Sequence, residues 1–258
     1  MEKTTHQKPK TNHKKATHVA FWPLIFNVAK LLVWTAVVLI ACQYAVTFGL
    51  YFILGKERLL TPVWTTVCNA LIYALATFLI IYVPVKFFKK QKPTKEQLGF
   101  KNFPTWTDIG LAPAGFVIYF ILAAILITIF SQFPFFDANE AQELGYDYLN
   151  SGLDRVVAFF ALCIVAPISE EIIFRGWLYD KLRNVIPGKK LSVILSNLLV
   201  SILFGIMHGQ WNVGVNVFAM SLVLCELREI TGTIHSGILL HILKNTLAFV
   251  LIYILGIS

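Results

Sequence analysis

The chain has 258 residues, of which 57% are hydrophobic and only 14% charged, and its formal net charge at pH 7 is +8. A mean hydropathy of +0.69 excludes an ordinary soluble domain and indicates a polytopic membrane protein. Because the lysines gather at the ends of apolar segments, the positive charge points to the lipid bilayer as partner, and no nucleic-acid partner is expected. We therefore expect an all-α transmembrane helix bundle.

The chain divides into three parts by composition. Residues 1–20 are polar and basic and are predicted to form a disordered tail. Residues 21–106 should hold the N-terminal transmembrane helices and a linker, and residues 107–258 the remaining helices. The first apolar run, 31–54, is too long for the core of a cleavable signal peptide and long enough to span.

About seven apolar segments are candidates for crossing a bilayer, and six to eight crossings fit the pattern. They are residues 31–54, 63–85, 109–130, 153–174, 191–207, 213–227 and 237–256. The segment 213–227 is the weakest because it has only about 15 residues where about 20 are needed.

The charges of the loops predict an orientation. Lysine and arginine cluster near the N-terminus, in residues 86–101 and in residues 175–190, whereas residues 131–154 lack both and carry five acidic side chains. With seven spans, the positive-inside rule places the N-terminus in the cytoplasm and both the acidic loop and the C-terminus outside.

Two adjacent glutamates, Glu170 and Glu171, end the fourth apolar segment. A charged side chain in hydrocarbon costs about 2.5–3.5 kcal/mol even on lenient insertion scales. In a helix, Glu171 and Arg175 are four residues apart and should pair, whereas Glu170 lies about 100° round the helix and needs a partner on another helix. Pro167 should free the carbonyl of Cys163. The alternative interpretation is a solvated salt bridge at the end of a surface helix.

Two later segments carry polar pairs with the same spacing. Phe204 and His208 share a helix face at the end of the fifth segment, and His241 and Asn245 share one in the last. A single histidine at a span end is more often an interfacial residue than a catalyst. A histidine and an asparagine four apart inside an apolar helix are hard to explain by packing. For His235, in a polar turn, we expect a solvated or capping role.

For three further polar residues we expect structural roles rather than catalytic ones. Asn197 and Asn216 are expected to form hydrogen bonds between helices. Lys244 should point away from the face shared by His241 and Asn245 and extend toward the membrane surface.

A carboxylate, two histidines and a carboxamide on three helices are the parts of a hydrolytic site. Glu170 could act as general base on a water held with His208. His241 and Asn245 could donate hydrogen bonds to the oxyanion that forms when water attacks a carbonyl. No serine or cysteine lies in a nucleophile motif.

The depths of these residues place a condition on that site. At about 1.5 Å per residue, Glu170 and His208 lie roughly 25 Å from the turn 186–190, while His241 lies about 10–15 Å from the last inner turn. They meet only if helices tilt or if residues 231–236 dip into the membrane.

Taken in order, the three motifs Glu-Glu-x-x-x-Arg, Phe-x-x-x-His and His-x-x-x-Asn resemble those of the CPBP family. This family comprises the CAAX prenyl endopeptidase and bacteriocin-processing intramembrane proteases and is also called Abi. The resemblance covers about residues 153–250 and implies an integral-membrane endopeptidase with a core of about four helices. It implies catalytic roles for Glu170, His208, His241 and Asn245, with Glu171, Arg175 and Phe204 supporting.

The resemblance also implies a membrane-associated peptide or protein as substrate, in peptide maturation or bacteriocin self-immunity. One alternative is a non-catalytic bacteriocin immunity protein that binds a peptide or receptor in the membrane. Another is a small transporter that uses Glu170 and Arg175 as a relay.

No cofactor is expected, although zinc remains an alternative. Glu170, His208 and His241 would make a zinc set of two histidines and one glutamate. The sequence has no His-Glu-x-x-His motif, and a water activated by the carboxylate explains the same residues without metal.

Overall fold

The computed structural model describes residues 21–87, 93–140, 149 and 152–256, and these residues are helical with short connections. The predicted basic tail, residues 1–20, lies outside the described residues. The α-helices are α1 (Phe21–Leu54), α2 (Lys56–Leu59), α3 (Pro62–Phe87), α4 (Trp106–Phe130), α5 (Gly152–Phe159), α6 (Ala166–Glu171), α7 (Asp180–Val185), α8 (Lys189–Ile206), α9 (Trp211–Thr231) and α10 (His235–Phe249).

Helices α5, α6 and α7 form one continuous helical run, Gly152–Val185, because π-helical segments join them at Phe160–Val165 and Ile172–Tyr179. A third π-helical segment, Val250–Ile254, extends α10. Within the described part of the chain, this run and α1, α3, α4, α8, α9 and α10 are the long helices. The predicted all-α class is confirmed.

Six of these helices are long and apolar enough to cross a membrane, which confirms a polytopic membrane bundle. The remaining one is α9, which contains the segment predicted as the weakest span. It has 21 residues, long enough to cross, but it carries Glu226, Arg228 and Glu229 near its C-terminal end.

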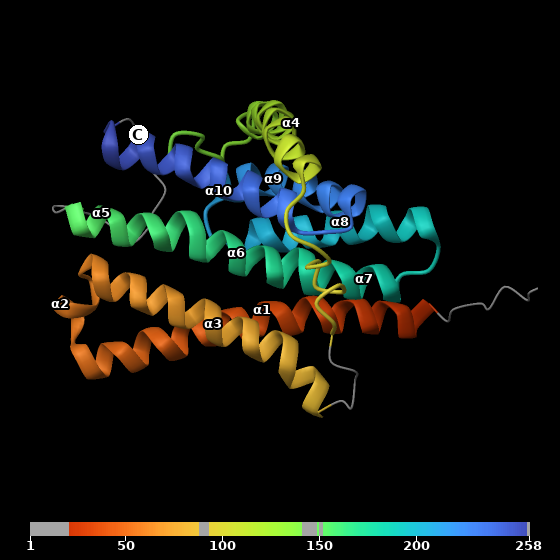
Figure 1. The fold of residues 1–258 in the computed structure, drawn as a ribbon, viewed down its shortest axis with the longest axis horizontal. Coiled ribbons are helices and arrows are strands. Elements are labelled where there is room, and N and C mark those ends of the chain that lie inside the picture. Colours follow the sequence, from red (N-terminus) through yellow and green to blue (C-terminus); the bar gives the residue numbers. More distant parts are fainter. Residues whose placement is uncertain (1–20, 88–92, 141–148, 150–151, 257–258) are drawn as a thin grey trace, which may run out of the picture.

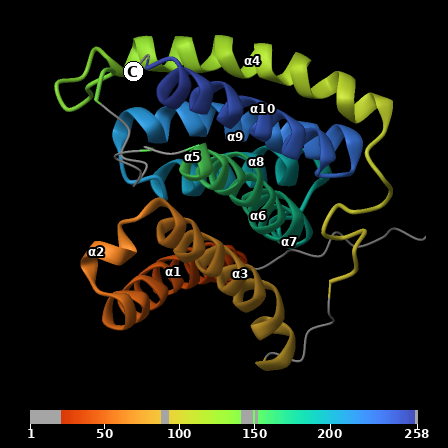
Figure 2. The ribbon, with the colours of Figure 1, turned by 60° about the vertical axis from the view of Figure 1, so that its left-hand side comes forward.

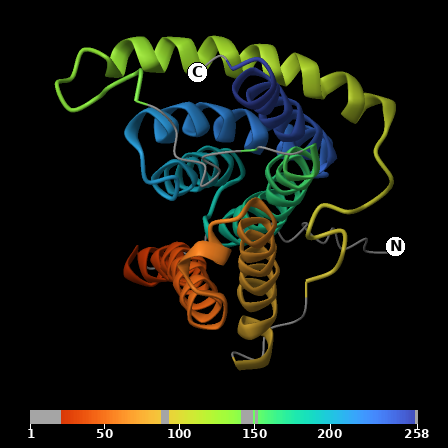
Figure 3. The ribbon, with the colours of Figure 1, turned by 90° about the vertical axis from the view of Figure 1, so that its left-hand side faces the viewer.

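The helices pack in layers around the run Gly152–Val185. Helices α1 and α3 pack against each other and lie together on one side of this run, and the C-terminal helices lie on the other (Figure 1). Helix α4 is outermost and crosses over α9 and α10 (Figure 2 and Figure 3). The run that carries the glutamate pair therefore lies between the N-terminal pair and the C-terminal helices.

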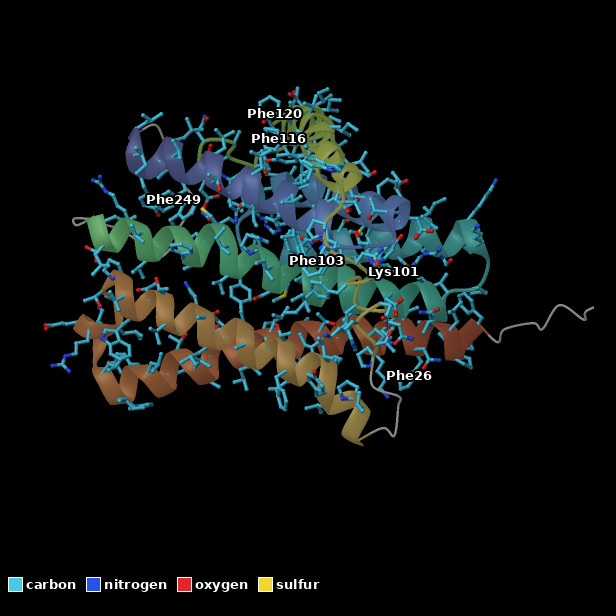
Figure 4. The ribbon with its side chains drawn as sticks, viewed as in Figure 1. Phe26, Lys101, Phe103, Phe116, Phe120 and Phe249 are labelled. Carbon is cyan, nitrogen blue, oxygen red and sulfur yellow. The ribbon has the colours of Figure 1, made fainter. Side chains whose placement is uncertain are left out.

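Apolar side chains cover the outer surface of α4. Ile118, Phe120, Ile121 and Ile125 are each more than half exposed, and Figure 4 shows Phe120 at the outer edge of the bundle. An exposed apolar face of this size fits contact with lipid.

Half-buried asparagines link the C-terminal helices. Asn197 of α8 donates from Nδ2 to the carbonyl of Leu222 in α9 at 3.1 Å. Tyr119 of α4 donates from its hydroxyl to Oδ1 of Asn216 in α9 at 2.8 Å. The predicted role of both asparagines in bonding between helices is confirmed.

The linker between α3 and α4 covers the turn between α9 and α10. Figure 4 shows Lys101 and Phe103 on this linker. The backbone N–H of Ile234 donates to the carbonyl of Gly99 at 3.2 Å, and His235 Nε2 lies 2.6 Å from the carbonyl oxygen of Asn102. His235 is buried and makes no helix cap, so the expected solvated or capping role is wrong. The linker, whose Asn102 lies 133 residues earlier in the sequence, excludes solvent from it.

A buried carboxylate fixes the start of α10. Oδ1 of Asp108, at the start of α4, accepts from Ser236 Oγ at 2.7 Å and from Thr233 Oγ1 at 3.1 Å, and its Oδ2 bonds Thr105. These bonds hold the first turn of α10 against the start of α4 and so fix the position of α10 relative to α4.

Candidate active site

The glutamate pair divides between two environments. Arg175 donates from Nη1 to Oε1 of Glu171 at 2.9 Å, and both side chains are 0% exposed. The predicted pair four residues apart is confirmed, and the alternative of a solvated surface salt bridge is wrong. Glu170 faces another way and lines a cavity. One carboxylate is thus neutralised within its own helix, and the other is directed to open space.

His241 lies between the two carboxylates. Its Nδ1 is 3.1 Å from Oε1 of Glu171, and its Nε2 is 3.6 Å from Oε2 of Glu170. Since Glu171 is an anionic acceptor, the Nδ1–H of His241 donates in this bond. Glu171 therefore orients His241 so that Nε2 faces Glu170.

A glycine lets α10 approach this closely. A Cβ at position 237 would lie 3.0 Å from Oε2 of Glu171, so a side chain there would press on the carboxylate. The turn 231–236 lies largely buried, and His241 reaches the depth of Glu170. His241 and Glu170 therefore lie close together, which was expected only if helices tilt or if residues 231–236 dip into the membrane.

Phe204 lies at the centre of the polar groups. Its ring centroid is 4.9 Å from that of His208 and 6.0 Å from that of His241, and the guanidinium carbon of Arg175 lies 4.6 Å above it. His208 Nδ1 is 2.8 Å from the backbone carbonyl oxygen of Phe204 and donates to it, which leaves Nε2 as the ring's other polar atom. The backbone and ring of Phe204 thus fix the plane of His208.

The end of α8, two residues before His208, is held by a close helix contact. A Cβ at Gly205 would lie 2.8 Å from the carbonyl oxygen of Gly214 in α9. Small residues allow this approach of two backbones, as is common between membrane helices.

Glu170 opens into a cavity of about 490 Å³ between α1, α3, the helical run and the end of α8. The hydroxyl of Tyr73 in α3 donates to Oε1 of Glu170 at 2.5 Å. Polar residues reach this cavity from three helices and from the turn after α8: Gln43, Asn69, Tyr73, Glu170 and His208.

The sequence analysis missed the residues that α1 and α3 contribute. Gln43, Asn69 and Tyr73 are polar side chains inside apolar runs, which is a signal for a functional role in a membrane helix.

Asn245 is engaged by the backbone of the neighbouring helix. Its Nδ2 donates to the carbonyl of Leu162 at 2.8 Å. Pro167 has no N–H, and in the π-helical register of Phe160–Val165 the carbonyl five residues earlier, that of Leu162, loses its partner. The expectation that Pro167 frees the carbonyl of Cys163 assumed α-helical spacing, which the segment Phe160–Val165 does not have. Asn245 keeps a second N–H, and its role toward an oxyanion stays a prediction.

Lys244 lies on α10 between His241 and Asn245. Its predicted extension away from their shared face, toward the membrane surface, stays a prediction.

The described residues do not form a ready zinc site. Glu170 and His241 approach each other, but no group of three or more histidine, cysteine, aspartate or glutamate side chains converges there as metal ligands would. Zinc binding requires at least three protein ligands at about 2.0–2.2 Å for nitrogen and oxygen. The arrangement does not fit the metal, and metal independence stays a prediction.

The fold and the site define a multi-pass membrane protein with a buried carboxylate–histidine centre. Residues 152–247 match the sequence model of the family described as type II CAAX prenyl endopeptidase Rce1-like. The membrane-embedded CAAX protease MroQ of Staphylococcus aureus (strain USA300) is 21% identical over 228 residues, 75% of this chain and 90% of the relative. No solved structure matched the chain.

These findings confirm the resemblance to the CPBP family that the motifs indicated. The family and the relative imply a membrane protease of the CAAX-protease type. Helices α1 and α3, with Gln43, Asn69 and Tyr73, lie outside the matched segment.

Proposed function

We propose that this protein is an integral-membrane endopeptidase that hydrolyses a peptide bond of a membrane-associated peptide or protein with a water activated by Glu170. The observation that supports this most is the shared cavity, in which Glu170 and His208 lie together with His241 behind them. Peptide maturation and bacteriocin self-immunity are the physiological roles we propose for this activity. Neither the non-catalytic immunity protein nor the transporter is favoured by any contact in the site.

The proposed reaction follows the roles of the groups. Glu170 accepts a proton from a water that His208 helps to hold, and the water oxygen attacks the peptide carbonyl carbon. The oxyanion accepts a hydrogen bond from Nε2 of His241, which carries a proton for this role in addition to the Nδ1–H bonded to Glu171, and Asn245 is a further donor. When the carbon–nitrogen bond breaks, protonated Glu170 returns its proton to the leaving amine, which regenerates the carboxylate.

The direct test is cleavage profiling of a library of membrane peptides by the purified protein. Wild type and Glu170→Gln should be compared at equal protein amounts. Products that require the carboxylate and share a cleavage position would support the proposal, and equal products from both proteins would point to a contaminating protease.

Metal chelation gives a second prediction. Since Glu170 activates water without a Lewis acid in this scheme, thorough chelation should leave the cleavage rate unchanged. Elemental analysis of the purified protein should show less than one zinc per chain. Near-stoichiometric zinc, lost together with activity in His208→Ala, would reverse the assignment.

The membrane orientation is a third prediction. We propose a cytoplasmic N-terminus and an external loop 131–154. Cysteine introduced at the exposed position 139 (Asn139→Cys) should react with a membrane-impermeant reagent in intact cells. The four native cysteines are buried and should give little background. Labelling that appears only after lysis would mean that the orientation is inverted.

A further inference from the structure

The wall of the site cavity opposite Glu170 carries two carboxamides that have no partner among the described residues. Gln43 of α1 and Asn69 of α3 line the same cavity as Glu170 and His208, and neither side chain forms a hydrogen bond within the described part of the chain. Three carboxamides of the C-terminal helices are, in contrast, bonded within the protein: Asn197 of α8, Asn216 of α9 and Asn245 of α10.

An unpartnered carboxamide in a membrane helix points to a ligand. Leaving an amide without a hydrogen bond in an apolar medium is costly, and a carboxamide offers both an N–H donor and a carbonyl acceptor. A peptide backbone offers the same two groups in return. A helical peptide satisfies them internally, whereas an unwound segment in hydrocarbon needs partners from the protein.

We propose that α1 and α3 form the substrate-binding wall, and that Gln43 and Asn69 hydrogen-bond the backbone of an unwound peptide segment. This inference rests on the proposed function and names what the site recognises: backbone amides rather than particular side chains. The cavity of about 490 Å³ falls in the range of about 300–1,000 Å³ typical of ligand sites and accommodates a short run of residues.

Tyr73 links this wall to the reacting group. It lies four residues from Asn69, so both share one face of α3, and its hydroxyl donates to Glu170. The bond fixes the distance between the backbone held at Asn69 and the carboxylate that activates water. Tyr73 is thus a positioning residue that holds Asn69 of α3 at a fixed place relative to Glu170.

The test measures binding in the Glu170→Gln protein, so that cleavage does not interfere. The first probe is a lysine-flanked polyleucine peptide with a central Gly-Pro pair, which interrupts its helix. The second is the same peptide without the interruption, and the third has one backbone N–H next to the break replaced by N-methyl. The interrupted peptide should bind most tightly.

Loss of one hydrogen bond should weaken binding about threefold to tenfold, which is the expected effect of Asn69→Leu, of Gln43→Met and of N-methylation at the bonded position. In the variant that has already lost that hydrogen bond, N-methylation of the peptide should cause little further loss of affinity. Asn27→Leu is the matched control, because Asn27 lies on α1 but lines a different cavity, and it should leave binding unchanged.

Equal binding of the interrupted and uninterrupted peptides would overturn the inference, as would undiminished binding in both Asn69→Leu and Gln43→Met or no binding of any probe. Gln43 is exposed, so Gln43→Met should fold even if Asn69→Leu does not. If the peptides bind as expected but the wild type cleaves nothing, the proposed peptidase function is wrong and the inferred binding wall stands. If cleavage requires Glu170 but neither Asn69→Leu nor Gln43→Met changes binding, the peptidase function stands and the binding wall is wrong.

Discussion

Glu170→Gln should abolish cleavage while the protein still accumulates in the membrane at the wild-type level. The amide keeps the shape of the side chain and can still accept the hydrogen bond from Tyr73, but it cannot take a proton from water. Loss of a general base lowers the rate by about 10²–10⁴, enough to look inactive in most assays. The measurement is the initial rate on a peptide from the cleavage profile, with protein amount determined by immunoblot.

The neighbouring glutamate provides the matched control. Glu171→Gln should retain part of the activity, because it weakens the orientation of His241 without removing the base. A Glu170→Gln protein that cleaves normally, together with a Glu171→Gln protein that folds but is inactive, would show that the base had been assigned to the wrong carboxylate.

Arg175→Ala should reduce both the amount of protein and its activity. It leaves Glu171 as a buried charge that has lost its ion pair, since the side chain is 0% exposed and Arg175 is its only cationic partner within the part of the chain that the structure describes, apart from His241 if protonated. Breaking a buried pair in this way costs about 3–5 kcal/mol. Accumulation in the membrane and resistance to thermal inactivation measure the loss.

The double variant Glu171→Gln with Arg175→Gln separates charge from shape. It removes both charges and should accumulate better than Arg175→Ala. Because His241 loses its anionic partner, it should keep only part of the activity, as in Glu171→Gln. If the double variant accumulates no better than Arg175→Ala, the loss comes from the contact of the guanidinium with Phe204 rather than from the stranded charge.

The parts of the site that follow from local spacing could be predicted from the sequence. Glu171 and Arg175 are four residues apart on one helix, so their pairing needs no knowledge of the fold. The same holds for the shared faces of Phe204 with His208 and of His241 with Asn245. Apolar runs and loop charges similarly predicted the helical class and the positions of the long helices.

The partners that come from elsewhere in the chain could not be predicted. Tyr73 bonds Glu170 from 97 residues away, and no pattern in an evenly apolar segment marks which polar residue will face the site. Asn245 bonds Leu162 only because the backbone there adopts π-helical spacing, which the position of Pro167 alone does not reveal. His235 is buried because the linker happens to cross it.

The linker between α3 and α4 has a mechanical consequence. It is tied down at Gly99 and Asn102 before the chain enters α4, and Asp108 then clamps the first turn of α10. A bulky substrate that enters beside α3 would displace α1 and α3. This movement pulls on the linker, which is bonded at Gly99 and Asn102, and not on α10. We therefore expect α1 and α3 to move outward without displacing His241 from its position between Glu170 and Glu171.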